Sequence, residues 1–323
     1  MGILLKDIGS FYIGGSQVTI SGKPVYKRQF VKGGPVRAVD PNGDFETGQM
    51  YVQYFKLDAP TQPYPVLLMH GGGVCGSVWE ENFAADKNWL QLFLEHGYDT
   101  YVADAMERGR SGFSQYPDIY ESEPIFRSKN EAWTNFRIGS EYNSDPAKRI
   151  AFEDTQFPVE YFDAFMKMNV PRWTTNNAGI LAAYRALLEK LSDCILIIHS
   201  QASEFAGALL KEFSSKVKAA VIIEGSSAPA DENLCTNVPT LYIWGSHIAK
   251  GSNWEIYRGN MLAYYEKQKA AKAPVEWLNL PDKGINGNSH FMMLDKNSTE
   301  IFNIIHTWLQ KIFNREMRIS TYG

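Results

Sequence analysis

The feature that most constrains the fold is a regular alternation of short apolar runs and amphipathic segments in the C-terminal half. The apolar runs cover residues 194–198, 219–223, 240–244 and 275–280. The amphipathic segments have the apolar spacing of helices and lie at residues 180–191, 202–213, 254–271 and 301–312. Continuous apolar strands that alternate with helices predict an α/β fold whose mostly parallel sheet is covered by helices on both faces.

The N-terminal part has a different pattern, which predicts antiparallel strands. Residues 11–13 and 17–20 flank Gly14-Gly15, and such a glycine pair between strand-like runs is typical of a hairpin turn. Further strands are expected at residues 25–31, 36–39 and 50–57, separated by turn-forming segments. Short apolar runs at 66–70 and 100–103 then begin the strand–helix alternation.

Residues 113–173 fit neither pattern and are dense in aromatic side chains. Long irregular insertions in a compact domain usually form lids or binding loops. We therefore expect residues 1–112 and 174–323 to form one core and residues 113–173 to form a lid or cap. The alternative is a second packing layer without a role at a site.

Charge and composition limit the classes of partner. The 323 residues carry a net charge of −4, and lysine and arginine are scattered, so no basic surface is expected to attract nucleic acid or anionic lipid. Three cysteines do not make a disulfide framework. No apolar run is long enough to span a bilayer. The first residues lack a secretory pattern, which predicts a cytoplasmic chain as given, or a secreted one if a signal peptide was removed.

Ser200 is the candidate nucleophile. A buried strand ends at residue 198, His199-Ser200-Gln201-Ala202 follows, and a helix begins at once. This is the pattern of a nucleophile elbow, a strained strand-to-helix turn that exposes a serine hydroxyl. Ala202 supplies the small residue that the elbow needs after the serine, whereas Ile198 departs from the small residue expected before it. The alternative is a serine that caps the helix N-terminus.

His290 is the candidate general base. A serine hydroxyl is a weak nucleophile until a base removes its proton. In enzymes with this elbow the triad follows the chain order serine, acid, histidine. His290 lies in Gly287-Asn288-Ser289-His290-Phe291, between the last strand and the last helix. We interpret His70 and His199 as structural.

Glu224 is the candidate acid that orients the base. The acid most often follows the strand at 240–244, but residues 245–250 contain no carboxylate. Glu224 directly ends the preceding apolar run, so it should lie at the same sheet edge as Ser200. In the alternative, Glu224 only caps a turn. The acid of the triad would then be Asp282 or Asp295.

Backbone N–H groups that could bind a substrate oxyanion are also predicted. One is the N–H of Gln201, directly after the nucleophile. The other belongs to the loop His70-Gly71-Gly72-Gly73, where glycine lets the backbone approach a substrate closely. The sequence leaves Gly72 and Gly73 open as the second donor.

Other segments indicate no further chemistry. Asp104 with Arg108-Gly109-Arg110-Ser111 is interpreted as structural support at the entrance to the lid. No metal-ligand spacing and no dinucleotide or phosphate fingerprint in context occurs, so neither a metal nor a cofactor is predicted. The residues expected to line the substrate pocket are Val74, Cys75, Phe126, Trp133, Phe162 and Phe291.

These motifs together resemble the α/β-hydrolases, and more narrowly a group of bacterial and fungal carboxylesterases typified by an esterase acting on esters of halogenated cyclic compounds. The most specific matches are His199-Ser200-Gln201 and Gly287-Asn288-Ser289-His290. The other matches, in chain order, are residues 11–15, His70-Gly71, Asp104 with residues 108–111, Glu224, residues 291–293 and Asp295. The resemblance implies the α/β-hydrolase fold with Ser200 as nucleophile, Glu224 in place of the usual aspartate and His290 as base. It also implies a lid and a homodimer.

The sequence therefore predicts a serine carboxylic-ester hydrolase that works through an acyl-enzyme. The aromatic insertion favours a bulky, apolar or aromatic ester or lactone as the small-molecule substrate. Two other functions stay open, because a fold does not fix a reaction. One is a lactonase or a carbon–carbon-cleaving, lyase-type enzyme on the same scaffold, and the other is a ligand receptor with low turnover.

Overall fold

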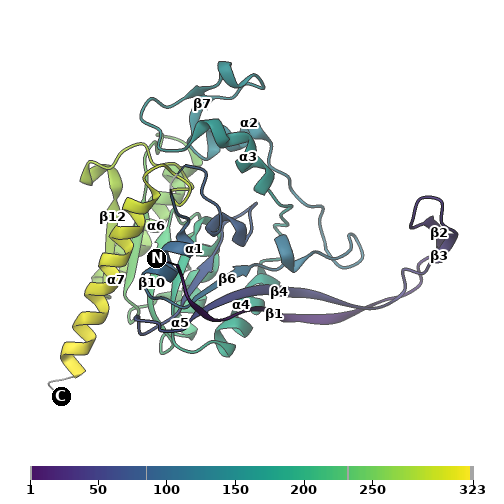
Figure 1. Cartoon of the computed structure of the whole chain (residues 1–323), viewed down its shortest axis with the longest axis horizontal. Coiled ribbons are helices and arrows are strands. Elements are labelled where there is room, and N and C mark those ends of the chain that lie inside the picture. The colour runs from purple at the N-terminus through teal and green to yellow at the C-terminus, as the bar shows by residue number, and fades with distance from the viewer. Residues whose placement is uncertain (1, 85, 231–232, 321–323) are drawn as a thin grey trace.

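The computed structural model describes residues 2–84, 86–230 and 233–320. Its centre is an eight-stranded sheet with the strand order β1-β4-β6-β5-β9-β10-β11-β12 (Figure 1). The strands, in that order, are Leu5–Ile20, Gly43–Leu57, Thr100–Asp104, Val66–Met69, Cys194–His199, Val217–Ile223, Thr240–Trp244 and Val275–Asn279. The pairs from β6 to β12 are parallel, whereas β4 is antiparallel to both β1 and β6. The predicted fold class, a mostly parallel sheet with N-terminal antiparallel strands, is confirmed.

Helices cover both faces of the sheet because the parallel strands are apolar on both sides. Along β9, Ile195 and Ile197 belong to one buried cluster, and Leu196 and Ile198 belong to the other. The first cluster packs under α1 (Trp89–Glu95) and α7 (Ser298–Ser320). The second packs under α4 (Asn177–Lys190), α5 (Ser203–Glu212) and α6 (Asn253–Ala270).

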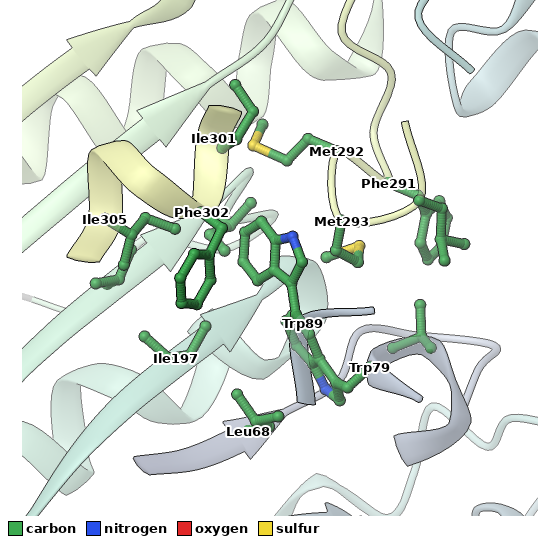
Figure 2. Close-up of a cluster of buried hydrophobic side chains, with 14 of the residues drawn as sticks. Leu68, Trp79, Trp89, Ile197, Phe291, Met292, Met293, Ile301, Phe302 and Ile305 are labelled. Atoms are coloured by element: carbon green, nitrogen blue, oxygen red, sulfur yellow. The ribbon is translucent and has the colours of Figure 1, made fainter. Parts of the chain in front are cut away.

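The first cluster also anchors the loop that follows residue 290. Figure 2 shows Met292 and Met293 of that loop beside Trp89 of α1, with Ile301, Phe302 and Ile305 of α7 packed around it and Leu68 and Ile197 of the sheet below. Trp89 and Phe302 meet edge to face, with ring centroids 6.2 Å apart. A loop whose side chains are buried this deeply holds its backbone in one position.

Gly14 and Gly15 do not form the predicted hairpin turn. β1 runs without interruption through both residues, and Gly14 pairs with Gln49 of β4. Both glycines have positive φ, and a Cβ on Gly14 would lie 2.9 Å from the Cα of Ala183 in α4. Gly14 therefore permits the close approach of α4 to the strand, and Gly15 permits the close approach of the β4 backbone, where a Cβ would lie 2.6 Å from the carbonyl oxygen of Thr47.

The chain reverses direction between the end of β1 and the start of β4, and a smaller hairpin lies in this connection. Its strands are β2 (Tyr26–Gln29) and β3 (Val36–Val39), which confirms the strands expected in this part of the chain. Figure 1 shows this hairpin projecting away from the body at the end of the long β1–β4 ribbon. Several of its apolar side chains are exposed, among them Val25, Tyr26, Phe30, Val31 and Val36.

Residues 113–173 lie outside the central sheet. They contain α2 (Lys129–Asn135), β7 (Gly139–Glu141), β8 (Ile150–Ala151) and α3 (Phe162–Phe165). An isolated bridge between Ile125 and Arg172 joins the two ends of this segment. The segment contacts the loop before residue 291 through the N–H of His290, which donates to the carbonyl of Phe136 at 3.0 Å. Among the described residues, no helix is long and apolar enough to cross a membrane.

Candidate active site

Ser200 stands on a sharp turn between β9 and the helical segment that begins with it. Its φ is +53°, a left-handed conformation that is rare for a non-glycine residue and typical of strained functional positions. Residues 200–202 form one 3₁₀ turn, and α5 continues from Ser203. Ile198, in place of the usual small residue, is fully buried in the same cluster as Ala202 and Ala206.

His290 lies directly against Ser200. Its Nε2 atom is 2.9 Å from Ser200 Oγ, and its Nδ1 atom is 3.3 Å from Glu224 Oε2. The structure therefore brings together the side chains of Ser200, Glu224 and His290, which the sequence predicts to lie at one edge of the sheet. Because Glu224 can only accept, Nδ1 carries the proton and Nε2 is free to accept one from the serine hydroxyl.

Glu224 is the first residue after β10 and is completely buried. Its φ is +52°, a second left-handed conformation at a non-glycine residue of the site. The N–H of Gly245 donates to Oε1 at 2.6 Å. Both carboxylate oxygens thus have partners, as a buried charge requires.

Arg137 is a second partner of Glu224 that the sequence did not reveal. Its Nη2 atom lies 2.7 Å from Glu224 Oε2, and both side chains are buried. The Nε–H of Arg137 donates to the carbonyl of Ser246 at 2.7 Å, and the guanidinium lies over the ring of Trp254 at 4.9 Å. Arg137 comes from the irregular segment 113–173, where no periodic pattern gives a signal.

Burial and nearby charge both act on the base. Burial, together with the positive charges of Arg137 and Arg127, holds the pKa of His290 well below its usual range. The rings of Trp254 and Phe136 lie 4.2 Å and 5.5 Å from the imidazole, measured between centroids. A neutral imidazole beside a serine hydroxyl is the state that a general base needs.

The two rival acids lie elsewhere. Asp295 is buried and accepts from the N–H and hydroxyl of Ser289 at 2.8 Å and 2.7 Å and from the amide of Asn288 at 3.0 Å. It therefore holds the loop that carries His290, and burial raises its pKa to about 7. Asp282 accepts from the side chain of Asn279 on the surface.

The other predicted structural residues support the loops around the site. His70 accepts the N–H of Ala105 at Nε2, and its Nδ1 atom lies 2.8 Å from the carbonyl of Gly71. Asp104 accepts the N–H groups of Gly76 and Arg110, both at 2.7 Å. His199 Nε2 lies 2.9 Å from the carbonyl of His290. These contacts join the glycine loop, the elbow and the histidine loop.

The glycine loop passes close to Ser200. A Cβ on Gly71 would lie 2.8 Å from the Cβ of Ser200, and a Cβ on Gly72 would lie 3.0 Å from Gln201 Oε1 and 2.9 Å from Arg172 Nη1. Gly73 has a φ of +77° and open space where a Cβ would be. Gly72 lines the cavity in front of Ser200, and Gly73 is not among its lining residues.

The cavity in front of Ser200 has a volume of about 360 Å³. Its polar lining comprises Arg127, Glu131, Asn135, Arg172, Gln201, Glu204, Ser226, Ser227 and Asn253, besides Ser200 and His290. Phe136, Trp254 and Tyr257 supply the aromatic part. No trio of His, Cys, Asp or Glu within the described ranges is placed to hold a metal ion.

The six residues expected to line the pocket are not in this lining. Val74, Trp133, Phe162 and Phe291 are buried in the first core cluster, where the aromatic rings pack on one another. Phe126 is 69% exposed. Cys75 lies beside Ser77, 3.3 Å from its hydroxyl. The aromatic side chains of segment 113–173 mainly hold that segment together, which composition alone does not distinguish from a pocket.

Comparison with known proteins gives a consistent result. A bacterial esterase of known structure superimposes with a TM-score of 0.81 and 28% identity over 96% of this chain and 97% of that one. A probable secreted lipase from a fungus (strain ATCC 74256) is 24% identical over 83% of this chain and 88% of the lipase. No family model matches the sequence.

Sheet order and similarity together give the chain the α/β-hydrolase fold, which defines its structural class. Within that class it is a carboxylesterase-type enzyme, the group to which esterases and lipases belong.

Proposed function

We propose that the chain hydrolyses carboxylic esters through an acyl-enzyme on Ser200. The observation that carries the proposal is the chain of contacts from Ser200 Oγ to His290 at 2.9 Å and from His290 to Glu224 at 3.3 Å. A serine, a neutral imidazole and a buried carboxylate in this order are the parts of a hydrolytic triad.

In the first half of the reaction, Ser200 Oγ attacks the ester carbonyl carbon while His290 Nε2 takes the hydroxyl proton. The carbonyl oxygen becomes negative and is bound by the N–H groups of Gln201 and Gly72. Gly72 is preferred to Gly73 because Gly72 lines the cavity beside Gln201. The tetrahedral intermediate collapses, the C–O bond to the alcohol breaks, and His290 returns the proton to the leaving oxygen.

In the second half, water attacks the acyl carbon and gives a proton to His290 Nε2. Collapse of the second intermediate breaks the bond to Ser200, and the proton returns to Oγ as the carboxylic acid leaves. Glu224 remains ionised throughout and stabilises the imidazolium that forms twice in the cycle. Arg137 fixes the position of that carboxylate.

Residues 113–173 are proposed to act as the lid. Five of the residues that line the cavity belong to this segment: Arg127, Glu131, Asn135, Phe136 and Arg172. A cavity of about 360 Å³ is at the small end of the range for small-molecule sites. The proposed substrate is therefore a compact ester whose apolar part contacts Phe136, Trp254 and Tyr257, rather than the bulky apolar ester expected from composition.

The expected homodimer also belongs to the proposal. Its test is the solution mass of the full chain by light scattering over a range of concentrations. A mass of twice the single chain supports the dimer, and the mass of one chain at every concentration contradicts it.

The acyl-enzyme is tested by labelling with a fluorophosphonate, which forms a stable adduct with an activated serine. We expect intact mass to increase by one label in the wild type and peptide mapping to place it on Ser200. Glu224→Gln should slow labelling, because the neutral amide no longer stabilises the imidazolium, whereas Asp282→Asn serves as the matched control. Labelling at another residue, or equal rates in wild type and Glu224→Gln, would contradict the proposal.

A further inference from the structure

Two hydrogen-bond donors beside Ser200 have no acceptor within the described part of the chain. Gln201 is 6% exposed, and its Nε2 amide is buried without a partner. The Nε–H of Arg172 is likewise buried without a partner. A buried donor without an acceptor is costly, and native proteins seldom leave one unless a ligand completes it.

The two residues that carry these donors line the same cavity. Both side chains pass close to Gly72, where an added Cβ would lie 3.0 Å from Gln201 Oε1 and 2.9 Å from Arg172 Nη1. The orientation of the Gln201 amide is fixed, because Oε1 accepts from Arg108 Nη2 at 3.3 Å. Nε2 is therefore the end of the amide that has no partner.

Arg172 carries a positive charge that no carboxylate neutralises at contact distance among the described residues. Glu107 forms its ion pair with Arg108, and Glu131 forms its ion pair with Arg127. Glu204, the other acid in the lining, accepts from the side chain of Asn177. Burial is the largest cause that lowers the pKa of Arg172. The negative charge of Glu204 acts against this effect, and the positive charge of Arg127 adds to it. An anion between the two arginines would relieve their repulsion.

The backbone holds Arg172 in place. Its N–H donates to the carbonyl of Ile125 at 3.1 Å, and its carbonyl accepts the N–H of Ile125 at 2.7 Å. The same pairing brings Arg127, two residues beyond Ile125, to the cavity wall. The ends of segment 113–173 thus deliver two guanidinium groups to the space in front of Ser200.

From this arrangement we propose that Arg172, with Gln201 Nε2 and Arg127, binds a carboxylate of the substrate. The natural substrate is then an ester that also carries a free carboxylate close to the scissile bond, such as a half-ester of a short dicarboxylic acid. A guanidinium presents paired donors that match the two oxygens of a carboxylate. This inference rests on the proposed ester hydrolysis and names the substrate class for it.

The test compares two p-nitrophenyl esters whose distal carboxyl group is either free or methylated. One is mono-p-nitrophenyl glutarate, and the other is its methyl ester, which is neutral. We expect wild-type kcat/KM to be higher for the anionic ester, and Arg172→Met to lower the ratio of the two values by about tenfold to a hundredfold, since hydrogen bonds to charged groups have this strength. Arg172→Lys should keep part of the preference, because it retains charge without the paired donors.

The matched control is Arg185→Met. Arg185 lies on the outer side of α4, where it pairs with Glu212 of α5 at 2.6 Å, and its removal should leave the ratio as in the wild type. Circular dichroism and thermal unfolding establish that each variant is folded. An equal loss on both esters in Arg172→Met would overturn the proposal, because Arg172 would then act on the reacting carbonyl or on the loop.

A second measurement separates this inference from the proposed reaction. Ser200→Ala protein is titrated with glutarate and with monomethyl and dimethyl glutarate by calorimetry. Binding that follows the number of carboxylates and weakens in Ser200→Ala/Arg172→Met supports the site, even if the wild type hydrolyses neither ester. Turnover of the neutral ester together with no binding of glutarate would overturn the site and leave ester hydrolysis intact.

Discussion

Arg137 Nη2 lies 2.7 Å from Glu224 Oε2, closer than the 3.3 Å that separates the same oxygen from His290 Nδ1. One carboxylate oxygen therefore serves a permanent cation and the proposed catalytic base. The positive charge of Arg137 also lowers the pKa of His290. We interpret Arg137 as a positioning residue that fixes the acid and keeps the base neutral.

Replacing Arg137 should move the pH profile as well as the rate. Arg137→Met removes one of the positive charges that lower the pKa of His290, so this pKa should rise. The fall of kcat/KM on the acid side of the pH profile should then occur at higher pH. We also expect kcat to fall about tenfold as Glu224 becomes less well placed. Arg137→Lys, which keeps the charge, should shift the limb less. A limb in Arg137→Met that coincides with the wild type would show that Arg137 serves the fold alone.

The wild-type acid limb is itself a prediction. A general base works only when it is unprotonated, and burial is the largest cause that lowers the pKa of His290. Activity should therefore persist to a lower pH than an ordinary histidine, with its pKa of about 6.5, would allow. Initial rates with a neutral ester between pH 4 and pH 9 measure this. A half-maximal point at or above pH 6.5 would contradict the assignment of His290 in this environment.

The two glycines that the sequence left open should behave differently. In Gly72→Ala the new methyl group meets the ends of Arg172 and Gln201, so kcat/KM should fall about tenfold while stability changes little. In Gly73→Ala the methyl group meets nothing, but the φ of +77° is strained, and stability should fall by about 1–2 kcal/mol. Denaturant unfolding and ester kinetics of both variants check this. If Gly73→Ala lowered kcat/KM and Gly72→Ala lowered only stability, Gly73 would be the better candidate for the oxyanion site.

Asp295 should give stability a dependence on pH that its amide variant lacks. Its pKa of about 7 in the folded protein exceeds that of an unfolded aspartate, so the folded state holds the proton more tightly. The resulting stabilisation is complete below about pH 4 and is lost as the pH rises toward 7. The Tm of Asp295→Asn relative to wild type should therefore rise between pH 4 and pH 8. A constant difference would show that Asp295 is ionised in the fold throughout.

The sequence predicted those site residues whose position follows directly from the order of the strands. The apolar run that ends two residues before Ser200 is a strand that stops at the sheet edge, and His290 follows the last strand at the same edge. Glu224 emerged because the residues after β11 offered no acid. Each inference needed only the order of strands and the rule that parallel strands end together.

The parts that could not be predicted depend on contacts between distant segments. Arg137 and Arg172 belong to an insertion without helical or strand periodicity, and their roles appear only when that insertion folds over the strand ends. The turn predicted at Gly14-Gly15 is wrong because a turn and a close approach of another backbone both call for glycine. Aromatic density predicted a pocket, whereas Trp133 and Phe162 pack on each other in the core.

The central claim is that Ser200 is the nucleophile, and its most direct test is hydrolysis of a graded series of p-nitrophenyl esters by wild type and Ser200→Ala side by side. We expect kcat of the variant to be at least about 10⁴-fold lower than that of the wild type while the fold is kept, because loss of a triad nucleophile removes most of the catalysis. Equal rates in the two proteins would contradict the triad, and with it the mechanism proposed for this hydrolase.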